Sequence, residues 1–267
     1  MIYKKIIYQG SEIVYNIQGK GQPVVLLHGF GFNNKIWNKL VENLKDKFMF
    51  ILPDLPGSGE SQPLKKENVS LSDFAHAINY LISEENIKLP VIIGHSMGGY
   101  ITMAFEKLYP EISKAICLFH SSTYADDEEK IKSRKKAIDF INNYGTETFL
   151  NNSIPALFYN KEKSIEEINL FLNDAKTIPS QVIIEYYNAM INREDNRDVL
   201  KNYKKPILFI IGEHDTAIPY QTSLEQTYIP NFSNLSILRD SAHMGMLEEP
   251  LKSSDIIHSF LIELSVK

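Results

Sequence analysis

A glycine-flanked serine between two different hydrophobic patterns constrains this chain more than any other feature. Residues 94–99 have the sequence Gly-His-Ser-Met-Gly-Gly, and the apolar run before them, at 90–93, has the length of a buried strand. The residues that follow, 100–105, carry apolar side chains at the spacing of a helix. A strand that turns at once into a helix needs small residues on both sides of the turn. The segment therefore predicts a sharp strand–turn–helix with Ser96 exposed at its apex.

Strand-like and helix-like patterns alternate along the first half of the chain. Continuous apolar runs, typical of strands that are buried on both faces of a sheet, are followed by amphipathic helical patterns. This order predicts strand–helix–strand crossovers, and hence a mostly parallel sheet with helices on both faces. With an N-terminal hairpin, the expected sheet has eight strands, at residues 2–8, 12–17, 23–27, 48–52, 90–93, 115–119, 206–211 and 235–238.

The alternation stops between residues 123 and 203, where no run has the pattern of a buried strand. Helical patterns separated by prolines fill this stretch instead. We therefore predict two units: an α/β core of residues 1–122 and 204–267, and a helical insertion of residues 123–203. At the start of the insertion, acidic residues at 126–129 precede basic residues at 130–136. That order suits a helix dipole and indicates a solvated helix face rather than a basic binding patch.

A serine hydroxyl becomes a nucleophile only when a base lies within hydrogen-bond reach and an acid orients that base. Among the seven histidines, His243 lies between the last predicted strand and the last helix, where such a base is expected. The acid should follow a strand, and Asp215 lies just after the seventh predicted strand. Glu213 lies nearer the end of that strand, where the loop gives a side chain less freedom than at Asp215. Asp240 is too close to His243 along the chain. We therefore predict a triad of Ser96, Asp215 and His243.

The tetrahedral intermediate of such a reaction carries an oxyanion, which needs preorganised N–H donors. One expected donor is the backbone N–H of Met97, directly after the nucleophile, and the other is that of Phe30, in the loop after the third strand. For His28 and His120, a purely structural role is the alternative to a place in the pocket. The candidate substrate contacts are His28, Gly29, Phe30, His120, Phe158 and Met244.

Five segments of the chain resemble the α/β-hydrolase superfamily, in sequence and in their order. The resemblance implies an α/β-hydrolase fold, in which residues 123–203 form a helical cap, with a Ser-Asp-His triad. Within the superfamily the chain is similar to small carboxylesterases and enol-lactonases. Ser96 stands where haloalkane dehalogenases and epoxide hydrolases of this fold use an aspartate. The matching segments are residues 28–31, 54–61, 94–99, 212–215 and 242–245.

The expected function is hydrolysis of a small carboxylic ester through an acyl-enzyme on Ser96. A lactone hydrolase or a C–C bond hydrolase of the same fold is an alternative, although C–C hydrolases often have asparagine where His95 stands. A ligand receptor that keeps the triad with negligible turnover is a second alternative. Acyl transfer to an alcohol and a perhydrolase side activity are also open.

Composition and charge argue against several kinds of partner. A net charge of −5 over 267 residues argues against nucleic acid, whose binding needs a basic face. No apolar run approaches the ~20 residues of a membrane span, and no signal peptide is recognisable, so we expect a cytoplasmic protein. Cys117 is the single cysteine and is expected to be a buried packing residue. No metal or organic cofactor is expected, because no His, Cys and carboxylate cluster has ligand spacing.

Overall fold

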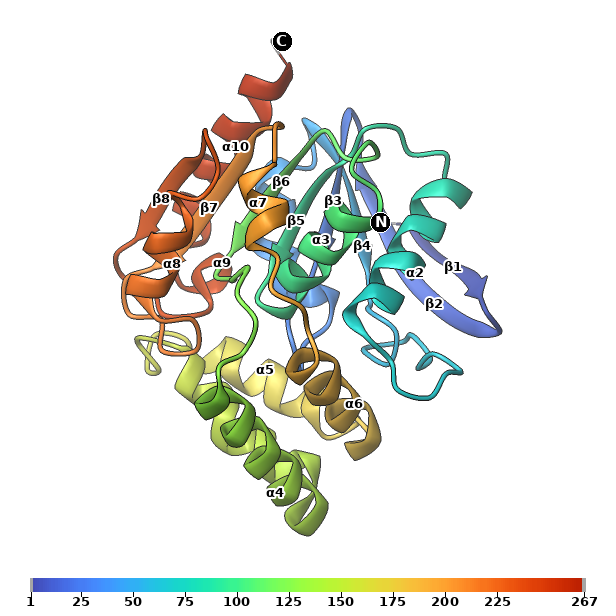
Figure 1. Cartoon of the computed structure of the whole chain (residues 1–267), viewed down its shortest axis with the longest axis vertical. Helices are drawn as coiled ribbons and strands as arrows, with labels where there is room; N and C mark the ends of the chain where they lie inside the picture. The colour runs from blue at the N-terminus through green and yellow to red at the C-terminus, as the bar shows by residue number, and fades with distance from the viewer. Residues whose placement is uncertain (1, 266–267) are drawn as a thin grey trace.

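An eight-stranded sheet forms the centre of the protein, whose residues 2–265 are described by a computed structural model (Figure 1). Met1 and residues 266–267, at the ends of the predicted core, lie outside the described residues. The strands are β1 (Ile2–Tyr8), β2 (Ser11–Gly19), β3 (Gln22–Leu27), β4 (Phe48–Pro53), β5 (Val91–His95), β6 (Ala115–Phe119), β7 (Ile207–Gly212) and β8 (Asn234–Leu238). Their order is β1-β2-β4-β3-β5-β6-β7-β8, and only the β1–β2 and β2–β4 pairs are antiparallel. The predicted mostly parallel sheet and its N-terminal hairpin are confirmed.

The register of the parallel strands brings four loops to one edge of the sheet. Gly94 of β5 lies opposite Leu27 of β3 and Leu118 of β6. Phe119 of β6 lies opposite Ile210 of β7. Parallel strands end at the same edge, so the loops after β3, β5, β6 and β7 meet there. The loop that carries the predicted nucleophile therefore lies between the loops that follow β3 and β6.

Helices cover both faces of the sheet (Figure 1). The helix that precedes β5 begins at a capping box, in which Ser70 and Asp73 each accept a hydrogen bond from the backbone N–H of the other. Within residues 2–265, no helix combines the length and the apolar content that a membrane crossing requires. One face carries α2 (Leu71–Glu84), α3 (Met97–Leu108) and α7 (Arg197–Lys201), and the other carries η1 (Asn34–Trp37), α1 (Asn38–Leu44), α9 (Gly245–Glu248) and α10 (Pro250–Ser265), while α8 (Tyr220–Gln226) follows β7.

The described residues between β6 and β7 contain helices and no strand. Most of these helices lie together beyond one end of the sheet (Figure 1). The longest of them continues through Gly145, whose φ of 82° and ψ of 161° bend it and suit a residue without a Cβ. The helices beyond the sheet are α4 (Glu128–Ser153), η2 (Ile154–Leu157), α5 (Ile165–Ala175) and α6 (Ser180–Ile191).

Backbone hydrogen bonds fix this helical segment to the rest of the chain. At its two ends, the N–H of Asn196 donates to the carbonyl of Thr123 at 2.9 Å. At its middle, the carbonyl of Leu157 in η2 accepts from the N–H of His243 at 2.9 Å. The first bond therefore joins the two ends of the segment, and the second joins its middle to the loop after β8. Its role as a separate cap unit stays a prediction.

The predicted solvated face of α4 is wrong at two charged residues. The side chain of Asp126 is fully buried and accepts from Nε of Arg134 at 2.5 Å and from Nη1 of Arg193 at 2.6 Å. The Arg134 side chain is only 12% exposed. The acidic and basic runs suggested two solvated clusters, whereas tertiary packing buries the Asp126 side chain between Arg134 and the distant Arg193.

Candidate active site

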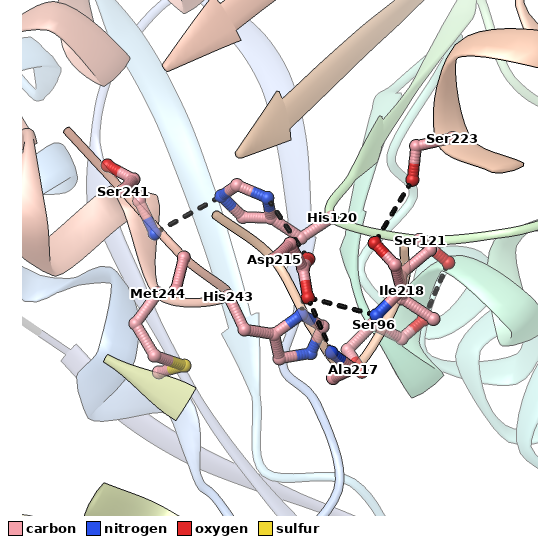
Figure 2. Close-up of polar contacts among 12 residues, drawn as sticks. Ser96, His120, Ser121, Asp215, Ala217, Ile218, Ser223, Ser241, His243 and Met244 are labelled. Carbon is pink, nitrogen blue, oxygen red and sulfur yellow. Dashed lines mark hydrogen bonds and ion pairs between the residues drawn. The ribbon is translucent and has the colours of Figure 1, made fainter. Parts of the chain in front are cut away.

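Ser96 lies at the turn between β5 and α3 in a strained backbone conformation. Its φ of 52° and ψ of −118° lie outside the regions that a residue with a side chain commonly adopts. Two hydrogen bonds hold this conformation: the N–H of Ser96 donates to the carbonyl of Phe119 at 3.1 Å, and the hydroxyl of Ser121 donates to the carbonyl of Ser96 at 2.7 Å. The loop after β6 therefore supports the turn from one side (Figure 2).

His243 and Asp215 lie side by side on the loops that follow β8 and β7 (Figure 2). Nδ1 of His243 lies 2.7 Å from Oδ2 of Asp215, and both side chains are at least 96% buried. The other carboxylate oxygen of Asp215 accepts from the N–H groups of Ala217 and Ile218, each at 2.9 Å. Because Asp215 is fixed on both sides, it fixes in turn the ring of His243. The bond also assigns the Nδ1 proton, which leaves Nε2 as the basic nitrogen.

A cavity of about 660 Å³ opens beside these residues, and Ser96, His243 and Phe30 all lie in its wall. Its size falls in the range of small-molecule sites. Much of the remaining wall comes from the helices beyond the sheet and is apolar, which suits the apolar part of a substrate. Apolar and aromatic members of that wall are Phe32, Phe149, Leu150, Ile154, Leu157 and Tyr187.

The predicted oxyanion donors occupy two backbone segments next to Ser96. Met97 is the first residue of α3, so its N–H has no acceptor within the helix. Within residues 2–265, neither the N–H of Met97 nor that of Phe30 donates a hydrogen bond. A Cβ at Gly29 would lie 3.1 Å from Cβ of Ser96, which shows how closely the loop after β3 approaches the nucleophile. Both N–H groups are therefore candidates to receive a negatively charged oxygen.

His28 joins the loops that follow β3 and β4. Its Nδ1 donates to the carbonyl of Gly29 at 2.9 Å, and its Nε2 accepts from the N–H of Leu55 at 2.9 Å. Complete burial lowers the pKa of His28 to about 4, so the ring is neutral at physiological pH. The neutral ring thus holds the backbone that precedes Phe30.

His95 directly precedes the predicted nucleophile in the chain, and its ring contacts the residue predicted to be the base. Its Nε2 donates to the carbonyl of His243 at 2.9 Å, and its ring centroid lies 4.8 Å from that of His243. Burial lowers the pKa of His95 well below its ordinary value, and the neighbouring His243 and His120 lower it further. His95 is therefore a neutral ring that fixes the backbone of the loop after β8.

The structure brings only one of the six predicted substrate contacts into the cavity wall. Phe30 lines the cavity, with its ring 4.4 Å from that of Tyr187. The other five lie outside the wall, where they are buried by contacts with the rest of the protein. These five are His28, Gly29, His120, Phe158 and Met244.

Tyr100 and Arg134 are among the cavity residues that the sequence did not predict. Tyr100 lies one helical turn after Ser96 on α3, and Arg134 projects from α4. The spacing of four residues from Ser96 is a signal that could have identified Tyr100, because such residues share a helix face. For Arg134 the sequence carries no such signal. Within the described residues, no group of three or more His, Cys, Asp or Glu side chains is arranged to hold a metal ion.

Residues 22–161, just over half of the chain, match the family model described as the alpha/beta hydrolase fold. The chain belongs to the α/β hydrolase fold family. A pimeloyl-[acyl-carrier protein] methyl ester esterase of Wigglesworthia glossinidia brevipalpis is 28% identical over 260 residues, which cover 92% of this chain and 96% of that protein. The α/β hydrolase family of this chain is therefore one that includes esterases.

Solved structures of the α/β hydrolase family superpose on almost the whole chain. A thermophilic esterase from Thermogutta terrifontis has a TM-score of 0.90 at 24% identity, and 99% of each chain is covered. The enol-lactonase of Burkholderia xenovorans LB400 has a TM-score of 0.89 at 19% identity, and 97% of this chain and 100% of that chain are covered. At these identities the likeness shows a common fold.

Proposed function

We propose that this protein is a serine hydrolase that cleaves a small carboxylic ester through an acyl-enzyme on Ser96. The observation that carries the proposal is the 2.7 Å contact between His243 Nδ1 and Asp215 Oδ2, made by a histidine that lines the same cavity as Ser96. This contact orients a basic nitrogen toward the space that a substrate would share with the serine hydroxyl. The esterase among the relatives of the chain supports an ester as the substrate.

The reaction follows from the positions of these groups. Nε2 of His243 takes the proton of the Ser96 hydroxyl as its oxygen attacks the acyl carbon, and the N–H groups of Phe30 and Met97 stabilise the oxyanion. When the C–O bond to the alcohol breaks, His243 returns the proton to the leaving oxygen. Water then attacks the acyl-enzyme with the same base, and the acid leaves with Ser96 restored. Asp215 stabilises the imidazolium that forms in each half of the reaction.

The test compares p-nitrophenyl esters of increasing acyl length on the wild-type protein and on Ser96→Ala. We expect turnover by the wild type and a loss of at least about a thousandfold in kcat for Ser96→Ala, because removal of a triad member leaves only binding and the oxyanion donors. Ser122→Ala is the matched control, since Ser122 lies near the same edge of the sheet but outside the cavity wall. Its activity should equal that of the wild type.

A fluorophosphonate probe separates the alternatives, because it modifies an activated serine whatever the natural substrate is. Labelling of Ser96 with steady ester turnover supports the proposal. Labelling without turnover of any ester would favour a lactone hydrolase, a C–C hydrolase or a receptor. Full activity in Ser96→Ala would show that another residue is the nucleophile.

A further inference from the structure

A guanidinium group in the wall of the proposed active site has unused hydrogen-bond donors. Arg134 projects from α4 into the cavity that Ser96 and His243 also line. Its five N–H groups make three hydrogen bonds within residues 2–265: two to the carboxylate of Asp126, at 2.5 and 3.4 Å, and a weak one to the sulfur of Met190 at 3.4 Å. Two N–H groups, one on each terminal nitrogen, are left for a ligand.

The charges around Arg134 do not balance. Asp126 is shared with Arg193, so one buried carboxylate faces two guanidinium groups. Arg193 lies outside the cavity wall, where it donates to the carbonyls of Tyr124 at 2.9 Å and Met190 at 3.2 Å and lies over the ring of Tyr100 at 4.1 Å. The excess positive charge is therefore presented to the cavity by Arg134.

Three other charged residues line the cavity: Asp127, Glu129 and Lys130. Asp127 and Glu129 are exposed at the start of α4, where water screens their charge. Lys130 is engaged, since its Nζ donates to the carbonyl of Ala217 at 2.8 Å. Screening is much weaker for a side chain that is only 12% exposed, so the charge of Arg134 acts more strongly inside the cavity than the charges of Asp127 and Glu129.

Aromatic contacts place Arg134 near the reacting end of the cavity. Its Cζ lies 5.7 Å from the ring centre of Tyr187, which lies 4.4 Å from the ring centre of Phe30. The two distances together put Cζ of Arg134 within about 10 Å of the Phe30 ring, beside the predicted oxyanion donor. A short linear substrate can therefore reach both groups at once.

We propose that Arg134 binds a carboxylate of the substrate, so that the preferred esters are small anionic esters with the charged group several bonds from the reacting carbonyl. This proposal rests on the proposed ester hydrolysis at Ser96. Two parallel N–H groups of a guanidinium match the two oxygens of a carboxylate, and such charge-assisted pairs are stronger than neutral hydrogen bonds. The remaining wall of the cavity is largely apolar and suits the chain between the two ends.

The experiment measures kcat/KM for matched anionic and neutral esters. Monomethyl adipate against dimethyl adipate tests a carboxylate on the acyl side, and acetoxybutyrate against its methyl ester tests one on the alcohol side. The proteins are the wild type, Arg134→Gln, Arg134→Lys and Lys135→Gln. Lys135→Gln is the control, because it removes the same charge from the next residue of α4, which is exposed and outside the cavity.

In at least one pair of esters, we expect the wild type to prefer the anionic ester. Arg134→Gln should lower the ratio of anionic to neutral kcat/KM by about ten- to a hundredfold, the usual worth of a charged hydrogen-bonded pair. Arg134→Lys should retain part of the ratio, and Lys135→Gln all of it. Glutamine can still bond Asp126, which also keeps its contact with Arg193, so Arg134→Gln is expected to fold, as a thermal melt will check.

The outcomes separate the two proposals. If the wild type hydrolyses none of the four esters and no p-nitrophenyl ester, the proposed function fails. If it hydrolyses neutral esters but the ratio is the same in Arg134→Gln, ester hydrolysis stands and the carboxylate site is wrong. An equal loss for both members of a pair, with a lower melting temperature, would show that Arg134 is only structural and would also overturn the carboxylate site.

Discussion

Nδ1 of His120 lies 3.6 Å from Oδ2 of Asp215, the same oxygen that His243 approaches at 2.7 Å. On its other side, Nε2 of His120 accepts from the N–H of Gly245 at 3.2 Å. The Nε2 contact assigns the proton of the neutral ring to Nδ1, which therefore faces the carboxylate. Burial and the nearby His243 lower the pKa of His120 well below its ordinary value. His120 is thus a neutral ring beside Asp215, with its Nδ1 proton near the carboxylate but beyond hydrogen-bond distance, and we expect it to help position that carboxylate.

Removing the ring of His120 should weaken the orientation of Asp215. We expect His120→Leu to lower kcat about tenfold with little change in KM, and to destabilise the fold by about 1–3 kcal/mol, because the N–H of Gly245 loses its acceptor. Steady-state kinetics and urea unfolding measure the two effects. His258→Leu on α10, outside the cavity, is the control for loss of a ring. An unchanged kcat in a folded His120→Leu protein would contradict the positioning role.

The buried ring of His28 should make stability depend on pH. Burial lowers its pKa from 6.5 to about 4, so between these values the unfolded chain binds a proton that the folded protein does not. The free energy of unfolding should therefore fall as the pH drops through this window, by about 1.4 kcal/mol per pH unit from His28 alone. His28→Gln should remove that part of the slope, measured by urea unfolding at several pH values. An equal slope in both proteins would show that His28 is not the group responsible.

A methyl group at Gly29 should disturb the predicted oxyanion donors. A Cβ there would lie 2.7 Å from Nδ1 of His95 and 3.1 Å from Cβ of Ser96, so the loop that carries Phe30 must shift. We expect Gly29→Ala to lower kcat by about a hundred- to a thousandfold, the effect of losing an oxyanion donor. Kinetics with a p-nitrophenyl ester measure this loss.

Gly145→Ala is the contrasting variant for this test. A Cβ at Gly145 meets no atom within 4 Å, but its φ of 82° is unfavourable for alanine. We expect Gly145→Ala to lower stability by about 1–3 kcal/mol and to keep kcat. A kcat that survives in Gly29→Ala would remove Phe30 from the oxyanion site.

Cys117 should be inert in the folded protein. The side chain is completely buried in β6, and burial raises the pKa of its thiol well above the ordinary value, so the reactive thiolate does not form. We expect iodoacetamide to modify Cys117 only when urea unfolds the protein, as intact mass shows. Rapid modification under native conditions would indicate that β6 opens locally.

The sheet could be predicted because its strands are continuous apolar runs that end at glycine-containing or polar loops. The turn at Ser96 could also be predicted, since a strand that turns at once into a helix leaves no room for a side chain at Gly94 or Gly98. Asp215 and His243 could be selected because each follows a predicted strand, and the structure brings their side chains together at 2.7 Å. Their catalytic roles, and that of Ser96, stay predictions.

The cavity wall could not be predicted in the same way. Helical periodicity indicates which residues face inward, but not which inward residues face a cavity rather than the core. Phe158 was expected to touch substrate and is packed away from the cavity, whereas Arg134 was expected on a solvated face and lies in the cavity wall. Arg134 contacts Asp126, eight residues before it, and Met190 of α6, and the second contact exists only after α4 and α6 have packed.

The hydrogen bond between Thr123 and Asn196 gives the helical segment a closed base. The chain leaves the sheet and returns close to the point at which it left. Insertions within the segment therefore need not displace the strands on either side. Longer loops also add little entropic cost. Ser96 precedes this base and Asp215 and His243 follow it, so the predicted catalytic groups lie wholly outside the segment. We therefore expect related proteins to differ in this segment more than in the sheet and its loops. Such differences would change which ester is bound, while the reaction at Ser96 stays the same.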